Sequence, residues 1–179
     1  LLASLIYSID RLANTVGHFE AYIKKSIEKT ELTMTLISAQ SYANSEIYRT
    51  DANQLARQIH SDIVYIDPPY NSRQYSRFYH VYETLIKWDK PELFGVARKP
   101  APENMSDYCS SKAVDAFRDL IEHLNAKYIV VSYNNTYNSR SKSSQNKISL
   151  EQIQYILESR GETHILTQKY NAFNAGKTD

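Results

Sequence analysis

Cysteine is nearly absent from this 179-residue sequence, which contains only Cys109. A single thiol excludes an internal disulfide framework and a zinc site built from several cysteines, and it suits a reducing compartment. The flanking residues, Ser106–Tyr108 and Ser110–Ser111, include no base or cation that would activate the thiol. We therefore interpret Cys109 as an ordinary residue at the entry of a helix, and we predict no metal site.

Long apolar runs are also absent. The longest, such as Ile63–Ile66 and Tyr128–Val131, are far too short to span a bilayer. The N-terminus lacks a basic region followed by a small-residue cleavage site. These absences predict a soluble cytoplasmic protein with no membrane partner. The apolar content of 42% and the aromatic content of 12% are sufficient for one sizeable core.

No charge of one sign dominates the sequence, whose formal net charge is +1. A general DNA-binding surface usually has a clear basic excess, so the overall charge does not identify a nucleic-acid binder. The distribution says more, because cations gather in two stretches that also carry tyrosines: Arg73, Arg77, Lys87, Arg98 and Lys99 in the first, and Arg140, Lys142 and Lys147 in the second. Tyrosines offer flat faces for stacking and hydroxyls for phosphate.

The spacing of apolar residues predicts helices that alternate with short strands. We expect helices over residues 1–16, 52–59, 79–88, 110–126 and 149–159, with Ser110 or Ser111 as the cap of the fourth. We expect strands over residues 33–38, 46–50, 62–66, 127–133 and 163–170, of which 62–66 and 127–133 are buried, and long loops over 90–108 and 134–147. This alternation predicts an α/β fold in which helices flank a mostly parallel sheet, with the ligand site beyond the carboxyl ends of the strands.

The two adjacent prolines of the sequence stand directly after the predicted buried strand, in Asp67-Pro68-Pro69-Tyr70. Adjacent prolines end the strand ladder and stiffen the backbone. Such a turn can direct two acceptors, the Asp67 carboxylate and the Pro68 carbonyl, at the two protons of an exocyclic amine, while Tyr70 stacks on a flat base. Holding both protons helps the nitrogen turn its delocalised lone pair toward an electrophilic methyl group. The tetrapeptide therefore predicts amine activation.

The tetrapeptide resembles the catalytic motif of amino-methyltransferases, in the form typical of adenine-specific DNA methylases. From about residue 45 onward the chain is similar to the Dam-like adenine methylases, particularly the modification enzymes of restriction systems. The similarity lies in the segments Asn71–Tyr75, Tyr79–His80, Tyr82–Thr84 and Val131–Asn135. The resemblance implies a Rossmann-like methyltransferase core, S-adenosylmethionine as cofactor, double-stranded DNA as partner, and Asp67, Pro68, Pro69 and Tyr70 as catalytic residues.

The resemblance also implies roles for residues outside the tetrapeptide. Asp51 matches the acidic residue that reaches the adenine amino group of the cofactor in this family, and Asp67 would meet its methionine end; Asp before a helix is also a common N-cap. A duplex substrate must present its base flipped out of the stack, which requires a grip on phosphate nearby. Arg73, Tyr75 and Arg77 are the candidates for that contact. We interpret His80 as a packed or capping histidine.

The sequence departs from the family in its glycines. The family holds the methionine end of the cofactor with a Phe-x-Gly-x-Gly turn, whereas this chain contains four glycines, no two of them close together. The chain also begins inside a predicted helix without Met. We therefore expect a piece of a longer enzyme, incomplete on the N-terminal side of the sheet, with a helical segment at 1–45 and the catalytic part at 46–179. Such a piece should bind the cofactor weakly or not at all, and it should expose an apolar sheet edge that it covers by dimerising or aggregating.

Two other readings are compatible with the sequence. Guanine amino-methyltransferases that act on ribosomal RNA can carry a similar tetrapeptide, and a binding module can keep the fold without catalysis. The long loop at 90–108 and the Arg/Tyr-rich stretch favour DNA, because compact RNA enzymes of this type usually have a short helix there. The leading prediction is an adenine-specific DNA methyltransferase.

Overall fold

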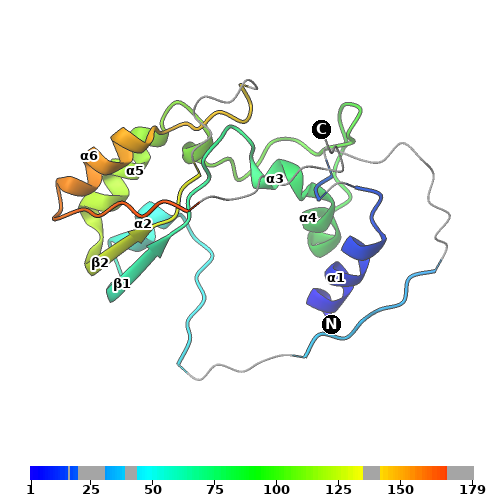
Figure 1. Cartoon of the computed structure of the whole chain (residues 1–179). Helices are drawn as coiled ribbons and strands as arrows, with labels where there is room; N and C mark the ends of the chain where they lie inside the picture. Colours follow the sequence, from blue (N-terminus) through cyan, green and yellow to red (C-terminus); the bar gives the residue numbers. More distant parts are fainter. Residues whose placement is uncertain (16, 20–30, 39–43, 135–141, 169–179) are drawn as a thin grey trace. The chain divides into compact units, whose positions relative to one another are not determined.

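The computed structural model describes residues 1–15, 17–19, 31–38, 44–134 and 142–168, which form two compact units (Figure 1). The first unit contains the described residues of Leu1–Glu46 and Tyr75–Asn104, and the second contains those of Ile47–Gln74 and Met105–Ala172. Among the helices of these ranges, none has the length and apolar content needed to cross a bilayer.

The second unit is built on a parallel pair of strands. β1 (His60–Ile66) pairs with β2 (Asn125–Val131) in a register that sets His60 opposite Asn125 and Ile66 opposite Val131. Four helical elements complete the unit: α2 (Ala52–Ala56), the 3₁₀ helix η1 (Asp107–Cys109), α5 (Ala113–His123) and α6 (Leu150–Glu158). Since the strands are parallel, both carboxyl ends lie at one edge of the sheet, as expected for an α/β fold.

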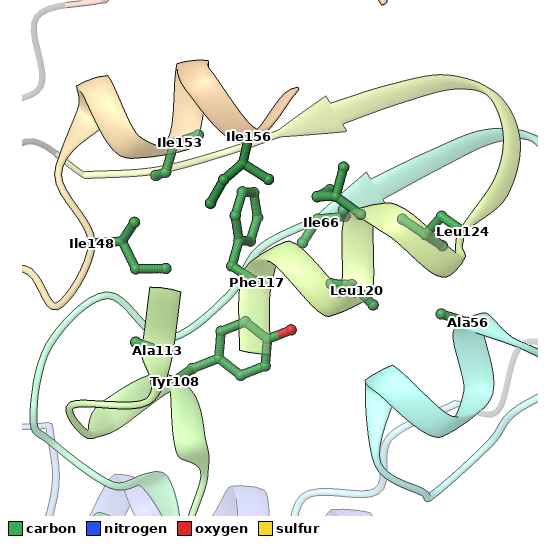
Figure 2. Close-up of a cluster of buried hydrophobic side chains, with 11 residues drawn as sticks. Ala56, Ile66, Tyr108, Ala113, Phe117, Leu120, Leu124, Ile148, Ile153 and Ile156 are labelled. Carbon is green, nitrogen blue, oxygen red and sulfur yellow. The ribbon is translucent and has the colours of Figure 1, made fainter. Parts of the chain in front are cut away.

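One face of this sheet forms the hydrophobic core with α5 and α6 (Figures 1 and 2). Phe117 and Ile121 on α5 and Ile148 before α6 are fully buried. Ile153 and Ile156 from α6 pack in the same cluster. The strands contribute every second side chain to it: Val64 and Ile66 from β1, and Ile129 and Val131 from β2.

The opposite face of the sheet is exposed in this chain. Ile63 and Tyr65 on β1 are 61% and 63% accessible, and Tyr128 and Val130 on β2 are 57% and 49% accessible. We predicted two buried strands from their continuous apolar sequence, and this prediction is wrong for one face. Strands of parallel sheets are apolar on both sides because such sheets are normally covered on both faces.

The first unit contains α1 (Leu2–Leu12), α3 (Tyr75–Phe78) and α4 (His80–Lys87). The Tyr82 hydroxyl on α4 donates a hydrogen bond of 2.5 Å to the Asp10 carboxylate on α1. The Phe19 ring packs edge-on against the Tyr82 ring, with the two centroids 4.9 Å apart. The Phe19 amide donates a hydrogen bond of 3.0 Å to the Phe78 carbonyl. These contacts join the N-terminal helix to the segment that follows the tetrapeptide.

Three predicted strands are absent from the described residues. Residues 33–38 are extended, but the Thr35 and Ile37 amides donate to the hydroxyls of Ser8 and Ser4 on α1, at 2.8 and 3.0 Å, instead of to a neighbouring strand. Residues 46–50 and 163–168 are irregular and mostly exposed, and residues 169 and 170 lie outside the described ranges. Apolar alternation alone therefore did not produce a strand at these positions of the described residues.

The helix predictions were closer, with differences at the ends. The helix predicted over 1–16 ends at Leu12, since Ala13 is extended, and the one predicted over 52–59 ends at Ala56. The helix predicted over 110–126 spans only Ala113–His123, and the predicted cap at Ser110 or Ser111 is wrong, because the N-cap is Lys112 without a side-chain hydrogen bond. The prediction over 149–159 is confirmed by α6, which Ser149 and Gln152 begin with a reciprocal capping box. Of the predicted loop 134–147, residues 135–141 are outside the described ranges.

Candidate active site

The tetrapeptide lies at the carboxyl edge of the sheet. β1 ends at Ile66, whose carbonyl accepts the Ser132 amide at 2.9 Å just after β2 ends. Asp67 then extends into solvent, whereas Pro68 is buried. The prolines cannot donate to a ladder, so the strand stops here and the backbone turns away from the sheet. An exposed carboxylate is thereby held on a buried, stiff support.

Tyr70, the last residue of the tetrapeptide, is fixed through its backbone. Its carbonyl accepts the Lys147 amide at 2.8 Å and the Tyr133 hydroxyl at 3.4 Å. The Tyr133 hydroxyl also accepts the Ile148 amide at 3.3 Å, and the two tyrosine rings meet edge-on with centroids 6.3 Å apart. Burial raises the pKa of Tyr133 to about 12, so its hydroxyl remains a donor at neutral pH. Tyr133 follows β2, which explains why it reaches the tetrapeptide across the sheet edge.

The segment after the tetrapeptide is tied down by Gln74. Its side chain is buried and forms two hydrogen bonds with the backbone of Ser106, donating to the carbonyl at 3.0 Å and accepting from the amide at 2.8 Å. The buried Cys109 lies in η1, where its thiol approaches the Arg73 carbonyl at 3.5 Å. Burial raises the pKa of Cys109, which disfavours the nucleophilic thiolate and agrees with the interpretation of this residue as structural.

Asp51 is the N-cap of α2, where its carboxylate accepts the Gln54 amide at 3.1 Å. The side chain remains exposed, so this bond leaves carboxylate surface accessible to a ligand. Its capping role is confirmed, and its contact with a cofactor stays a prediction.

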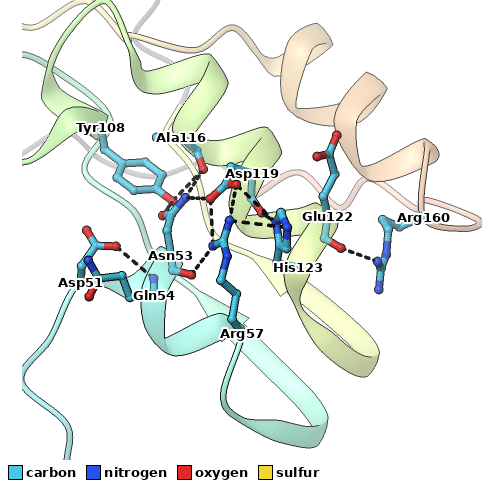
Figure 3. Close-up of polar contacts among 10 residues, drawn as sticks. All are labelled: Asp51, Asn53, Gln54, Arg57, Tyr108, Ala116, Asp119, Glu122, His123 and Arg160. Carbon is cyan, nitrogen blue, oxygen red and sulfur yellow. Dashed lines mark hydrogen bonds and ion pairs between the residues drawn. The ribbon is translucent and has the colours of Figure 1, made fainter.

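A network of polar side chains holds α2, and therefore Asp51, against α5 (Figure 3). Asn53 donates to the Ala116 carbonyl at 2.8 Å and to Asp119 at 2.7 Å, and accepts from the Tyr108 hydroxyl at 2.8 Å. Arg57 binds both carboxylate oxygens of Asp119, at 2.5 and 3.1 Å. The hydrogen bond from Arg57, with the one from Asn53, lowers the pKa of Asp119 to about 2. We call these side chains the α2–α5 clamp.

The clamp also sets the direction in which α2 runs relative to α5 and β2. Asn53, early in α2, contacts Ala116, and Arg57, at the end of α2, contacts Asp119, which comes later in α5. The two helices therefore run in the same direction. α5 turns back into β2 through Leu124 alone, so α5 begins where β2 finishes (Figure 2). The cap of α2 therefore lies toward the carboxyl edge of the strands.

The three residues predicted to contact nucleic acid are divided between the units. Arg73 is exposed in the second unit, and its guanidinium donates to the Ser144 hydroxyl at 3.2 Å. Tyr75 and Arg77 belong to the first unit, where Tyr75 is exposed and Arg77 donates to the Pro100 carbonyl at 2.6 Å. His80 is buried, with Nδ1 2.9 Å from the Arg77 carbonyl, which confirms its interpretation as a packed histidine.

Residues that sequence reasoning missed are those that position the site: Tyr133, Gln74, Asn53 and Asp119. Only Tyr133 carried a usable signal, because it follows the strand that a parallel sheet sets beside the tetrapeptide. Across the described ranges, no three His, Cys, Asp or Glu side chains are grouped as metal ligands would be.

Comparison with known proteins places the chain in a family. Residues 1–172 match the model of the D12 class N6 adenine-specific DNA methyltransferases. The chain is 40% identical over 167 residues to the type II methyltransferase M.FokI of Planomicrobium okeanokoites, covering 90% of this chain and 24% of that protein. It is 33% identical over 184 residues to the type II methyltransferase M.NlaIII of Neisseria lactamica, covering all of this chain and 52% of that protein.

A third relative is the modification methylase StsI of Streptococcus sanguinis, 40% identical over 141 residues that cover 75% of this chain and 21% of that protein. The chain thus spans about half or less of the length of these relatives. No solved structure matches it. The family match extends over nearly the whole chain and includes the tetrapeptide at the sheet edge, and the chain therefore belongs to the D12 class N6 adenine-specific DNA methyltransferases.

Proposed function

We propose that this chain supplies the catalytic part of an enzyme that methylates the exocyclic amino group of adenine in double-stranded DNA, as the modification enzyme of a cytoplasmic restriction system. The observation that carries the proposal is the presentation of Asp67-Pro68-Pro69-Tyr70: an exposed carboxylate at the carboxyl end of β1, on a buried proline, beside a tyrosine with a fixed backbone. Membership of the D12 class supports adenine as the target.

The residues of the tetrapeptide have distinct roles in this proposal. The Asp67 carboxylate and the Pro68 carbonyl accept the two protons of the amine, which orients the nitrogen lone pair. Tyr70 stacks on the flipped base. Tyr133 is a positioning residue, because it acts on the base only through the Tyr70 carbonyl and ring.

The acidic residues of the sheet edge fit the cofactor that the family implies. Asp67, directly after β1, and Asp51, at the N-cap of α2, both present exposed carboxylates, suited to the amino groups at the two ends of S-adenosylmethionine. When bound, this cofactor supplies an electrophilic methyl group. The 179 residues include no glycine pair for a close backbone approach between these ends, so Asp51 and Asp67 together form a partial site.

The proposal extends to the fold and its divisions. We propose that β1, β2 and the helices of the second unit belong to a Rossmann-like methyltransferase core that the chain contains in part. The catalytic part begins near residue 46, after an N-terminal helical segment at 1–45. The segment Tyr75–Asn104, which groups with Leu1–Glu46, then interrupts the catalytic part in sequence.

Transfer of tritium from labelled S-adenosylmethionine tests the proposal in the whole protein as its gene encodes it. The substrates are unmethylated plasmid DNA, ribosomal RNA and a reaction without nucleic acid. We expect label in DNA alone, recovered after digestion to nucleosides as N6-methyl-2′-deoxyadenosine. Label in RNA guanine would replace the proposal with its nearest rival, and no transfer to any substrate would identify a non-catalytic module.

A further inference from the structure

The long loop between α4 and η1 contains a closed hairpin tip. Phe94 and Lys99 pair as an antiparallel bridge, with amide-to-carbonyl hydrogen bonds of 2.7 and 3.0 Å in the two directions. The Arg98 amide closes the turn on the Gly95 carbonyl at 3.2 Å. Gly95 and Arg98 both have positive φ, 67° and 49°, as a tight reversal requires. We call Phe94–Lys99 the hairpin tip.

The base of this hairpin is anchored within its own unit. Arg77 holds the Pro100 carbonyl at 2.6 Å, one residue after the bridge. Lys87, at the end of α4, forms an ion pair with Glu103. These contacts fix both the start and the end of the loop, so the hairpin tip projects from a defined support.

The hairpin tip exposes apolar side chains that a solvated turn does not need. Val96 at its apex is 89% accessible, and Phe94 beside it is 50% accessible. Trp88, where the loop begins, is 66% accessible, with the Lys90 ammonium 5.3 Å from its ring centroid. Turn positions normally carry Gly, Asn, Asp or Ser, so a bare valine at an apex suggests a surface that becomes covered.

Within the hairpin tip the charge has one sign, whereas Asp89, Glu92 and Glu103 lie in the loop before and after it. From Leu93 to Ala101 the charged residues are Arg98 and Lys99, with no acidic residue between them. An apolar apex flanked by cations matches the chemistry of duplex DNA, in which phosphates surround the apolar faces and edges of the bases. Proteins that enter a groove use such apolar wedges together with Arg and Lys.

We infer that the hairpin tip is a DNA-contacting wedge, in which Arg98 binds the phosphate backbone and Val96 contacts the bases or sugars of the groove. This inference rests on the proposed function, because it takes DNA as the polyanion. It assigns DNA contact to residues 94–99, beyond the candidates Arg73, Tyr75 and Arg77. It also gives a role to a loop that the chemistry of the tetrapeptide does not use.

Two variants of the whole protein separate the two halves of the contact. Binding to unmethylated plasmid DNA is measured across a range of salt concentrations. Arg98→Gln should reduce the slope of log affinity against log salt by about 0.9, as expected for the loss of one phosphate contact. Val96→Ser should weaken binding by about tenfold with the slope unchanged, because it removes apolar contact and no charge.

Matched controls are available at exposed positions of the other unit. Ile47→Ser changes an apolar side chain that is 96% accessible, and Lys112→Gln removes an exposed cation. Both controls should bind DNA as the wild type does, and all four variants should keep the wild-type melting temperature.

The inference is overturned if Val96→Ser and Arg98→Gln behave like their controls. It is also overturned if both variants leave DNA binding intact and instead weaken binding to phosphatidylserine vesicles, which would make the hairpin tip a lipid contact. Tritium transfer to DNA by the wild type distinguishes failure of the wedge from failure of the proposed function. If the wild type methylates DNA while the variants bind as controls do, the wedge alone fails; if the wild type transfers no label, the proposed function fails.

Discussion

Asp67 and Tyr70 stand three residues apart, yet their surroundings differ in kind. The Asp67 side chain is exposed at the end of β1, whereas the Tyr70 carbonyl is held by two donors from the segment beyond β2. The exposure of Asp67 leaves its carboxylate accessible to a substrate, and the hydrogen bonds to the Tyr70 backbone hold the Tyr70 ring in a fixed orientation. The chemistry proposed for each residue can therefore be tested separately.

Replacement of Asp67 by alanine should abolish methyl transfer while leaving cofactor binding measurable, because the lost group orients the amine. Loss of one such acceptor typically lowers the rate by about a hundredfold or more. The measurement is kcat in the whole protein, with Asp62→Ala as the control, since Asp62 is an exposed carboxylate on β1, the strand that ends just before Asp67. Near-normal turnover of Asp67→Ala would remove Asp67 from the chemistry.

Truncation of the Tyr70 ring should matter more than loss of its hydroxyl. Stacking on a base is worth about 1–3 kcal/mol, so Tyr70→Ala should lose much more activity than Tyr70→Phe or Tyr70→Trp. The comparison uses kcat/KM for the three variants on one DNA substrate. Equal losses would assign the effect to the phenolic oxygen instead of the ring.

Tyr133 should act through position and not through contact with substrate. Tyr133→Phe removes one of two donors to the Tyr70 carbonyl and leaves the Lys147 amide in place, so we expect a loss of about fivefold in kcat/KM. Tyr133→Ala also removes the ring contact and should lose more. A 2-aminopurine at the target site reports stacking of the flipped base: its fluorescence should rise in Tyr133→Ala and stay near wild type in Tyr133→Phe. Identical spectra and rates in all three proteins would make Tyr133 irrelevant to the site.

Individual residues of the site differed in how far the sequence predicted them. The place of Asp67-Pro68-Pro69-Tyr70 directly after a strand was predictable, because an apolar run precedes the prolines, and the catalytic roles of these residues stay predictions. Gln74 was not, because its partner is the backbone of Ser106, thirty-two residues later, and a backbone group leaves no mark in the sequence.

At the scale of elements, α2 depends on its contacts more than on its own length. It has five residues and is held to α5 by the α2–α5 clamp. An isolated helix of this length is not stable in water. The clamp therefore supports both the fold of α2 and the place of its cap, Asp51.

The clamp should make stability depend on acid pH. The pKa of Asp119 is lowered to about 2 in the folded protein, below the value near 3.9 of an unfolded chain. Ionised Asp119 therefore makes its full contribution to the free energy of unfolding above about pH 4, and this contribution is lost as the pH falls toward 2. Asp119→Asn should thus lower the melting temperature at neutral pH, with a difference from wild type that shrinks between about pH 4 and pH 2.

Asp115→Asn is the matched control for this titration, because Asp115 is an exposed acid on the same helix and, within the described part of the chain, its ion pair is with Arg118, three residues later. It should change the melting temperature little at any pH. A constant difference between Asp119→Asn and wild type down to pH 2 would show that the ionised clamp does not contribute to stability.

Helices and strands were not equally predictable. α6 was predicted well because nearby residues specify where it begins, through the capping box of Ser149 and Gln152. The strands predicted at 33–38 and 46–50 failed because a strand needs a partner that its own residues do not specify. In the first case the serine hydroxyls of α1 took the place of that partner.

At the scale of the whole chain, one face of the sheet exposes a group of neighbouring apolar side chains among the described residues. Ile63 and Tyr65 lie beside Tyr128 and Val130, and all four side chains are about half exposed or more. A contiguous apolar surface on a parallel sheet favours association, because such sheets are stable when both faces are buried. The 179-residue chain studied by itself should therefore self-associate through this face.

Light scattering across a range of concentrations measures this association, and single charges on the face should weaken it. Tyr65→Lys and Tyr128→Lys each place an ammonium where a partner surface must pack, at a cost of several kcal/mol if it is buried unpaired. Tyr155→Lys is the control, because Tyr155 is 73% accessible on α6, away from the sheet. We expect the first two variants to shift the chain toward monomer and the third to leave it unchanged. Association that persists equally in all three would assign it to another surface, and a monomeric wild type at high concentration would show that the exposed face is tolerated in water.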